Sequence, residues 1–382
     1  MSHTPKYPRK QFRCSLLIHD PVIDFDRGNT DILTWDDFLK RRPEVVGDQD
    51  RLFSSNRLLG RHVPVYEDSF HYVRKHLFMG KDGWDVGVVD GKDAFAVFSV
   101  SRKVTGPVKV FKPLGDPDLM SKVGKGSVGQ LYKWYAQALG WLARRYPDRE
   151  VSILGIPNAR GVHKLVPFGY HRGLEQQIYD IKNTDLDVLP GRRWKNVRNK
   201  ISVFQKSIEG ADDGGASGIG KGSSVEMRNL DGDTLDVARD FVIQWRQRSL
   251  DGSRFRFSDI SPTLWALDHH SSNRYDDAWG GMMFMDGRVI SVQLAFGIKG
   301  APRPSASHVV GISDIQTAGT AEFAQVEFWK QLKRHGIEMV NDGPSWSASQ
   351  LAFKKKFSPA STTGVYSGML DLKRVQPGNQ SR

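Results

Sequence analysis

The sequence contains little cysteine and no long apolar run. Cys14 is the only cysteine among 382 residues, which excludes an intrachain disulfide and any cysteine-based metal cluster and fits a reducing cytoplasm. No uninterrupted apolar stretch approaches the ~18 residues that a membrane span needs. Residues 1–13 are polar and basic and have no apolar signal-peptide core. We therefore expect a cytoplasmic protein without stable membrane insertion.

Metal-ligand spacings and nucleophilic triads are also absent from the sequence. The histidines, including the pair His269 and His270, do not have the spacing of a zinc site. The segment Asp231-Gly232-Asp233 does not continue as a calcium loop, because Leu235 stands where an oxygen ligand is required. We expect neither a bound metal nor a resident cofactor.

Negative charge is scarce relative to positive charge. The chain has 55 Lys and Arg against 43 Asp and Glu, a formal net charge of +12. This excess favours a polyanionic partner, which can be nucleic acid, a phosphorylated substrate or an anionic membrane surface.

The imbalance is concentrated in residues 192–206, which contain no acid. Trp194, Val197, Ile201 and Phe204 recur there at helical spacing, so the segment is predicted to be a basic amphipathic helix. A solvated helix face is the alternative, but the lack of compensating acids favours anion binding. The candidate phosphate-binding residues are Arg192, Arg193, Lys195 and Arg198.

A run of three lysines lies near the C-terminus. Lys354, Lys355 and Lys356 stand between Phe353 and Phe357, where an ordinary surface helix would mix charge signs. Leu351, Phe353 and Phe357 are close in helical register and are expected to anchor the segment. The lysines are then expected to project from its rim toward an anionic partner, or to form only a solvated helix end.

The two halves of the sequence repeat one order of elements. Hairpins are predicted around Asp90-Gly91 and around Asp286-Gly287, and an amphipathic helix, a short strand, a short helical stretch and a closing strand follow each. This order predicts an α+β fold of two tandem units, each a mixed central sheet flanked by helices. The expected boundaries are 1–185 for the first domain, 186–224 for the basic helix and a Gly/Ser-rich loop, and 225–382 for the second domain.

A glycine-rich segment, residues 124–129, matches the pattern G-x-G-x-x-G before a helix. No convincing strand leads into it, which argues against a dinucleotide site. A pyrophosphate loop of an N-acetyltransferase is an alternative, although Ser121 replaces the Gln or Arg expected to open that loop. The third possibility is a plain flexible connection.

Several short segments, in their order along the chain, resemble a known family. They run from about residue 85 to 370 and comprise Leu114-Gly115-Asp116-Pro117, Phe168-Gly169-Tyr170, the basic segment 192–206, Trp245, Ser313-Asp314 and Leu351-x-Phe353-Lys354-x-x-Phe357-x-Pro359. The pattern resembles the C-terminal domain of phosphatidylglycerol lysyltransferases and their soluble relatives, which share a duplicated N-acetyltransferase-like fold with Fem-type transferases. Residues 313–321 lack the arginines of lipid-modifying members, so the resemblance implies neither lysine specificity nor a lipid acceptor.

The resemblance implies an aminoacyl-tRNA-dependent aminoacyltransferase with a small-molecule or peptide acceptor, in specialised metabolism. By that analogy Lys354 stabilises the oxyanion, and Asp314 orients or deprotonates the attacking amine. Lys355 and Lys356 hold phosphates, and Phe353 and Trp245 are the candidate substrate-binding residues. Aminoacyl-tRNA is then a co-substrate. The alternatives are an acyl-CoA-dependent N-acetyltransferase on the same fold and a non-enzymatic RNA-binding module.

Overall fold

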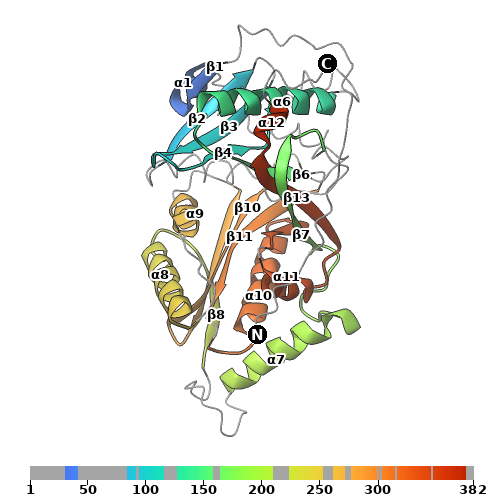
Figure 1. The fold of residues 1–382 in the computed structure, drawn as a ribbon. Helices are drawn as coiled ribbons and strands as arrows, with labels where there is room; N and C mark the ends of the chain where they lie inside the picture. The colour runs from blue at the N-terminus through green and yellow to red at the C-terminus, as the bar shows by residue number, and fades with distance from the viewer. Residues whose placement is uncertain are drawn as a thin grey trace, which may run out of the picture.

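A computed structural model shows one mixed β-sheet with helices on its faces (Figure 1). It describes residues 31–41, 84–91, 94–115, 127–157, 164–209, 223–252, 261–271, 277–298, 301, 303–314, 316–345 and 347–375. The expected α+β class with a mixed sheet is confirmed. Among the described residues, no helix is both long and apolar enough to cross a membrane.

The strands form a continuous sheet in the order β1-β2-β3-β4-β6-β13-β7-β12-β11-β10-β9-β8, with β5 paired to β3. Their bounds are β1 (Asp31–Thr34), β2 (Trp84–Gly91), β3 (Ala94–Ser101), β4 (Val108–Phe111), β5 (Leu114–Gly115), β6 (Val151–Pro157), β7 (Phe168–Asp180), β8 (Val225–Asn229), β9 (Ala278–Met285), β10 (Arg288–Gly297), β11 (Ser305–Ser313), β12 (Met339–Pro344) and β13 (Ser361–Leu370).

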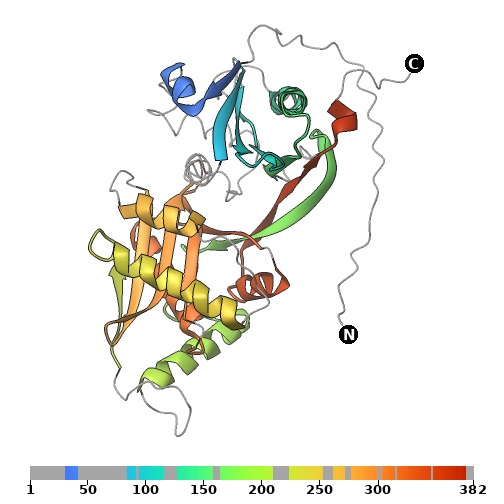
Figure 2. The ribbon, with the colours of Figure 1, turned by 60° about the vertical axis from the view of Figure 1, so that its left-hand side comes forward.

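The helices cover both faces of this sheet. Their bounds are α1 (Trp35–Arg41), α6 (Ser127–Arg145), η5 (Arg192–Trp194, a 3-10 helix), α7 (Lys195–Glu209), α8 (Leu235–Gly252), α9 (Ser261–Ser271), α10 (Thr320–Arg334), α11 (Ala348–Lys355) and α12 (Leu372–Val375). In the second half of the chain, α8 and α9 lie on one face of the sheet, and α7, α10 and α11 lie on the other (Figures 1 and 2).

The predicted repetition is visible in the strand pairings. In each half a hairpin is followed by two parallel strands that are joined through a helix: β4 and β6 through α6, and β11 and β12 through α10. The second hairpin turns at Asp286-Gly287, where both residues have positive φ, as the sequence predicts. The first turns later than predicted, because Asp90 and Gly91 belong to β2 and pair with Phe95 and Ala94.

The two halves exchange their closing strands. β7 follows the first half, yet its end pairs with β12 of the second half, from Asp180 opposite Met339 to Gln176 opposite Pro344. β13 ends the second half but pairs with β6 of the first. The two strands also pair antiparallel with each other and form a ribbon between the upper and lower parts (Figure 2). Leu370 accordingly belongs to the apolar core of the first half. The division into two domains at 185 and 225 stays a prediction.

Helix α7 packs closely on the first turn of α10. The stripe predicted along this segment is confirmed, since Trp194, Val197 and Phe204 are buried. Gly319 precedes α10 with φ 88°, and a Cβ there would lie only 2.0 Å from the backbone oxygen of Lys200. Only glycine permits this approach, because its conformation is left-handed and it has no side chain.

Gly319→Ala is expected to destabilise the protein more than Gly336→Ala does. Gly336 also has a positive φ, of 81°, but a Cβ there meets no atom within 4 Å, so alanine costs only the left-handed strain of about 1–2 kcal/mol. At Gly319, alanine would introduce the same strain and would also push α7 away from the start of α10. Urea unfolding of both variants measures the difference. Equal losses would show that α7 is not held against α10.

A network of charges joins the end of β7 to β11 and β12. Arg303 forms two hydrogen bonds to the carboxylate of Asp180 (2.9 and 3.3 Å) and one to Glu338 (2.7 Å), and Lys182 also contacts Glu338. Partial burial would raise the pKa of Asp180, but hydrogen bonds from Arg303 and Asn183 outweigh it and lower that pKa to about 2. The network fixes the exchanged strand β7 to the second half.

The contribution of Asp180 to stability is expected to depend on pH. Because its pKa is lowered from 3.8 to about 2 in the folded state, its stabilisation is complete above 3.8 and is lost as the pH falls toward 2. Asp180→Asn is therefore expected to lower the urea midpoint at pH 7, and the difference from wild type should shrink below pH 4. In an Arg303→Met background the substitution should cost less, and only the hydrogen bonds from Asn183 should remain to be lost. A constant loss across this range would contradict the assignment.

Candidate functional site

Strands β11 and β12 separate at a cluster of buried polar side chains. Their ladder runs only from Ser305 opposite Met339 to Ser307 opposite Asn341, although β11 continues to Ser313. His308 and Asp342 are the next residues on the two strands. We call the group at this point the parting cluster; it consists of Ser291, Gln293, His308, Gln325, Asp342 and Lys354.

Hydrogen bonds fix the orientation of His308. Ser291 donates to the Ile312 carbonyl at 3.0 Å and accepts from the Gln293 amide nitrogen at 2.7 Å. The Gln293 amide oxygen therefore faces His308 Nε2, at 2.8 Å, and this nitrogen must carry the proton. His308 Nδ1 lies 3.3 Å from Asp342 Oδ1. The ring is held by one protein group on each side.

Asp342 is a nearly buried carboxylate, with its side chain 11% exposed. Burial would raise its pKa, but the charge of Lys354 and the neighbouring His308 and Gln325 side chains outweigh this effect and hold the pKa below its usual range. The parting cluster therefore contains a fixed negative charge beside a fixed positive one.

From the sequence, Lys354 was expected to project from the rim of its helix. In the structure it does not. It is 5% exposed, and its ammonium group donates to the backbone carbonyls of Asp342, Gly343 (3.1 Å) and Pro344 (3.4 Å). Gly343 has φ 69°, and the chain at the end of β12 presents these carbonyls to α11. All three N–H groups of the ammonium have acceptors, so a direct contact with an oxyanion requires exchange of one carbonyl.

The neighbouring lysines are paired with acids. Lys355 lies 3.1 Å from Glu175 of β7, and Lys356 lies 3.2 Å from Glu322 in the first turn of α10. The Lys356 ammonium also lies 5.2 Å from the ring centre of Phe353. Phe353 packs against the apolar core of the second half. The lysine run is therefore fixed to β7, β12 and α10, and phosphate binding by Lys355 and Lys356 stays a prediction.

Asp314 and Trp245 lie together, away from Lys354. The Trp245 indole donates to the Ser313 carbonyl at 3.1 Å. The buried Asp314 carboxylate accepts from the backbone N–H of Gln316 at 3.0 Å and lies 3.3 Å from Arg288. The two catalytic candidates, Asp314 and Lys354, do not contact each other.

Most cations of the basic helix point into solvent. Arg192, Arg193, Lys195, Lys200 and Lys206 are exposed, and within the described residues no acid pairs with any of them. We call these five side chains the α7 basic face. Arg198 differs from the prediction, because its guanidinium donates to the carbonyls of Leu189 and Gly191 and holds the preceding loop.

The α7 basic face begins beside the turn that follows the lysine run of α11. Ser358, in the turn after α11, donates to the Arg193 carbonyl at 3.3 Å. The start of the basic helix and the helix that covers the parting cluster are therefore in contact. This arrangement places exposed positive charge next to a buried polar site.

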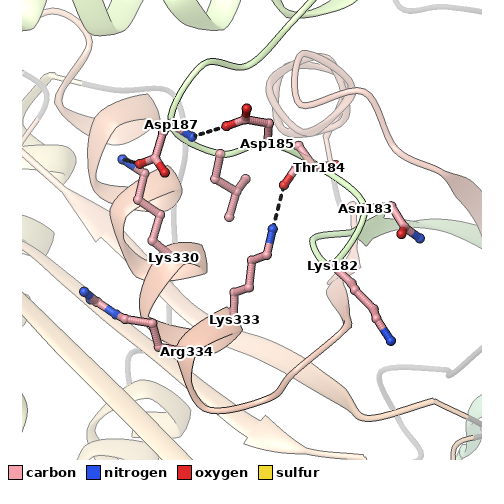
Figure 3. Close-up of a pocket in the computed structure, with 9 residues that line it drawn as sticks. Lys182, Asn183, Thr184, Asp185, Asp187, Lys330, Lys333 and Arg334 are labelled. Carbon is pink, nitrogen blue, oxygen red and sulfur yellow. Dashed lines mark hydrogen bonds and ion pairs between the residues drawn. The ribbon is translucent and has the colours of Figure 1, made fainter.

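A basin of about 580 Å³ lies at the other end of α10 (Figure 3). It is lined by Lys182, Asn183, Thr184, Asp185, Leu186, Asp187, Lys330, Lys333 and Arg334. No candidate from the sequence analysis belongs to it.

Two predicted loops fall outside the described residues. Of residues 124–129, only the last three are described, as the start of α6, and residues 210–222 are not described. His308, Gln325 and Asp342 are not among the residues predicted from the sequence. The available signals were a histidine within an apolar strand and an acid at the end of another.

Solved structures with this fold include three that cover most of the chain. No protein-family model matches the sequence, and no curated protein is significantly similar to it. A conserved protein of unknown function from Bacteroides thetaiotaomicron VPI-5482 has a TM-score of 0.59 at 14% identity and covers 85% of this chain and 97% of its own.

The C-terminal domain of a putative lysylphosphatidylglycerol synthetase from Agrobacterium fabrum has a TM-score of 0.50 at 13% identity (86% of this chain, 93% of its own). A tandem GNAT protein from the clavulanic acid biosynthesis pathway has a TM-score of 0.51 at 11% identity (92% and 100%). At these identities the similarity is one of fold, and the fold of this chain is N-acetyltransferase-like.

Proposed function

We propose that this protein transfers an amino acid from aminoacyl-tRNA to an amine or hydroxyl group of a small molecule or peptide. The observation that carries the proposal is the α7 basic face, whose cations have no acidic partner among the described residues and which contacts the turn after α11, the helix that carries Lys354. RNA backbones are bound through such cations. The fold shared with a domain of a putative lysylphosphatidylglycerol synthetase supports acyl transfer as the reaction class.

The reaction is attack of the acceptor on the ester carbonyl of the charged tRNA. The acceptor loses a proton, the new amide or ester bond forms, and the tRNA ribose hydroxyl leaves with a proton. Negative charge develops on the carbonyl oxygen and needs a fixed donor. In this proposal Lys354 supplies it by exchanging its longest contact, to Pro344 at 3.4 Å. Asp314, which lies apart from Lys354, orients the acceptor in this proposal, and Phe353 and Trp245 contact substrate.

An acyl-CoA-dependent N-acetyltransferase is the second candidate. Gln316 and Gly319 precede α10, so this loop has the glutamine that the 124–129 segment lacks. Backbone N–H groups at a helix start bind phosphate well. However, the Lys200 carbonyl oxygen lies against Gly319 and brings a partial negative charge to this helix start. That contact disfavours a pyrophosphate there and favours the tRNA-dependent reaction.

A transfer assay tests the proposal. The purified protein is incubated with total tRNA charged with isotopically labelled amino acids and with a small-molecule extract, and products are identified by mass spectrometry. A labelled aminoacyl product that disappears after RNase treatment is expected. Labelled acetyl-CoA in a parallel reaction tests the second candidate. Turnover in neither reaction, with RNA still bound, would leave a non-enzymatic RNA-binding module.

A further inference from the structure

Backbone carbonyls of consecutive residues converge on one point at the end of β12. The ammonium of Lys354 donates to each of them. They belong to Asp342, to Gly343 at 3.1 Å and to Pro344 at 3.4 Å. In a regular strand successive carbonyls point to opposite sides, but Gly343, with φ 69°, turns the chain so that these oxygens face the same atom. We call the three oxygens the carbonyl cage.

The chemistry of the carbonyl cage is that of a site for an ammonium ion. A carbonyl oxygen only accepts hydrogen bonds, and a primary ammonium group has N–H donors and no acceptor. The Asp342 carboxylate adds negative charge beside the cage, because the positive charge of Lys354 lowers its pKa although burial opposes this. Hydrogen bonds from a charged donor are stronger than neutral ones. The cage therefore favours a charged amine over a neutral group.

The backbone of Lys354 is held independently of its ammonium. The Tyr179 hydroxyl donates to the Lys354 carbonyl at 2.9 Å, and burial and the Asp342 charge raise the pKa of this hydroxyl, so it stays a donor. At the start of α11, the Ser347 hydroxyl accepts from the backbone N–H of Gln350 at 3.1 Å. Neither contact involves the ammonium. The ammonium can therefore exchange an acceptor while α11 stays in place.

The Pro344 end of the carbonyl cage is the one nearest to solvent. Its contact to the ammonium is the longest of the three, and Pro344 is partly exposed whereas Gly343 is buried. The backbone N–H of Ser345 donates to the Glu175 carbonyl at 3.1 Å, and the Glu175 side chain is half-exposed. The Ser345 hydroxyl is buried without a hydrogen-bond partner among the described residues. Such a group is expected where a ligand supplies the partner.

We propose that the carbonyl cage binds the ammonium group of the substrate, which shares the cage with Lys354 when the ester is bound. The identity of this ammonium rests on the proposed function: it is the α-amino group of the aminoacyl ester. The amine nitrogen and the ester carbonyl are attached to the same carbon. Binding of the ammonium at the Pro344 carbonyl therefore places the ester carbonyl beside the Lys354 ammonium, and the Asp342 carboxylate offsets the added charge.

An amine of the acceptor is the other source of an ammonium group. An attacking amine must be unprotonated, because its lone pair forms the new bond. Hydrogen-bond acceptors around an amine favour its charged form. The carbonyl cage therefore suits the amine that does not attack, which is the α-amino group of the aminoacyl ester.

The first experiment empties the carbonyl cage and offers it a free amine. Lys354→Ala removes the part of the side chain that n-propylammonium replaces, and Lys355→Ala is the matched control on the same helix. Thermal unfolding is measured with the chloride salts of n-propylammonium, sodium and tetramethylammonium, the last of which has no N–H donor. Only n-propylammonium should raise the Tm of Lys354→Ala, by about 2 °C or more once it exceeds its Kd about tenfold. Lys355→Ala and wild type should not respond.

The second experiment uses the wild-type protein. Total tRNA is charged with labelled amino acids or with the corresponding α-hydroxy acids, and the acids retained with the protein on a filter are quantified. A hydroxyl group replaces the ammonium at nearly the same size but without its charge. The preferred aminoacyl-tRNA should therefore bind about tenfold or more tightly than its hydroxy analogue, the usual effect of a hydrogen bond from a charged group. Deacylated tRNA gives the affinity of the RNA alone.

Rescue by n-propylammonium together with weaker binding of the hydroxy analogue is the expected result. Rescue with equal binding of both charged tRNAs would overturn the aminoacyl ester as the source of the ammonium. A folded Lys354→Ala protein that does not respond would overturn the cage as an ammonium site. If that variant does not fold, equal binding of the two charged tRNAs overturns the proposal. Neither experiment requires turnover, so a failed transfer assay with a positive rescue would reject the proposed function and not the site.

Discussion

Lys354→Met is expected to cost about 3–5 kcal/mol of unfolding free energy, because three backbone carbonyls lose a charged donor and each acceptor left unsatisfied costs about 1–3 kcal/mol. Methionine keeps much of the side-chain volume but no donor. The carbonyls of Asp342, Gly343 and Pro344 lose their shared ammonium, and the Asp342 carboxylate loses its positive neighbour. A decrease in Tm of about 5–10 °C should accompany the change.

The matched control is the next residue of the same helix. Lys355 is half-exposed and pairs only with Glu175, so Lys355→Met should cost no more than about 1 kcal/mol. Urea unfolding of both variants gives the comparison. If Lys354→Met were as stable as Lys355→Met, the ammonium would not support β12. Its role as an oxyanion donor would then gain weight over the structural one.

Reversing three charges of the α7 basic face should weaken tRNA binding about 100-fold or more near 0.1 M salt. Arg193, Lys195 and Lys200, each replaced by Glu, would present repulsion where the wild type contacts phosphates. Because each phosphate contact contributes about 0.9 to the slope of log K against log salt, the slope should fall by about 2–3. Folding should be preserved, since none of the three pairs with an acid in the part of the chain that the structure describes.

A variant with the same change in net charge isolates the effect of position. Lys103, Lys133 and Arg144 are exposed cations of the first half, and their replacement by Glu should reduce affinity much less. Anisotropy with deacylated tRNA measures both variants. Equal losses would mean that overall charge, and not the α7 basic face, determines binding.

The sequence predicts local structure well where periodicity and turn residues decide it. Trp194, Val197 and Phe204 are buried as their spacing indicates, and Asp286-Gly287 forms the predicted turn. Asp90-Gly91 carries the same signal, but tertiary packing moves the turn. Asp90 is buried near Arg41, and a Cβ at Gly91 would lie 2.6 Å from the indole nitrogen of Trp134. Such contacts come from residues that are distant in the sequence, so the local turn signal does not reveal them.

The candidate site could be predicted only in part for the same reason. The lysine run indicates a special segment, but the acceptors of Lys354 are carbonyls at the end of β12, and Glu175 lies on β7. Neither partner can be inferred from spacing within the helix. Likewise, the order of strands gives two similar halves but does not reveal which half each closing strand joins.

The exchange of β7 and β13 has a consequence for synthesis of the chain on the ribosome. The sheet of the first half needs β13, residues 361–370, which are translated after the rest of the second half, and until then β6 has an open edge. Neither half can complete its sheet while the other is missing, so the first half cannot finish folding ahead of the second. Long-range pairing of this kind slows folding and exposes unpaired edges meanwhile. We therefore expect nascent chains to depend on chaperones until β13 has emerged from the ribosome.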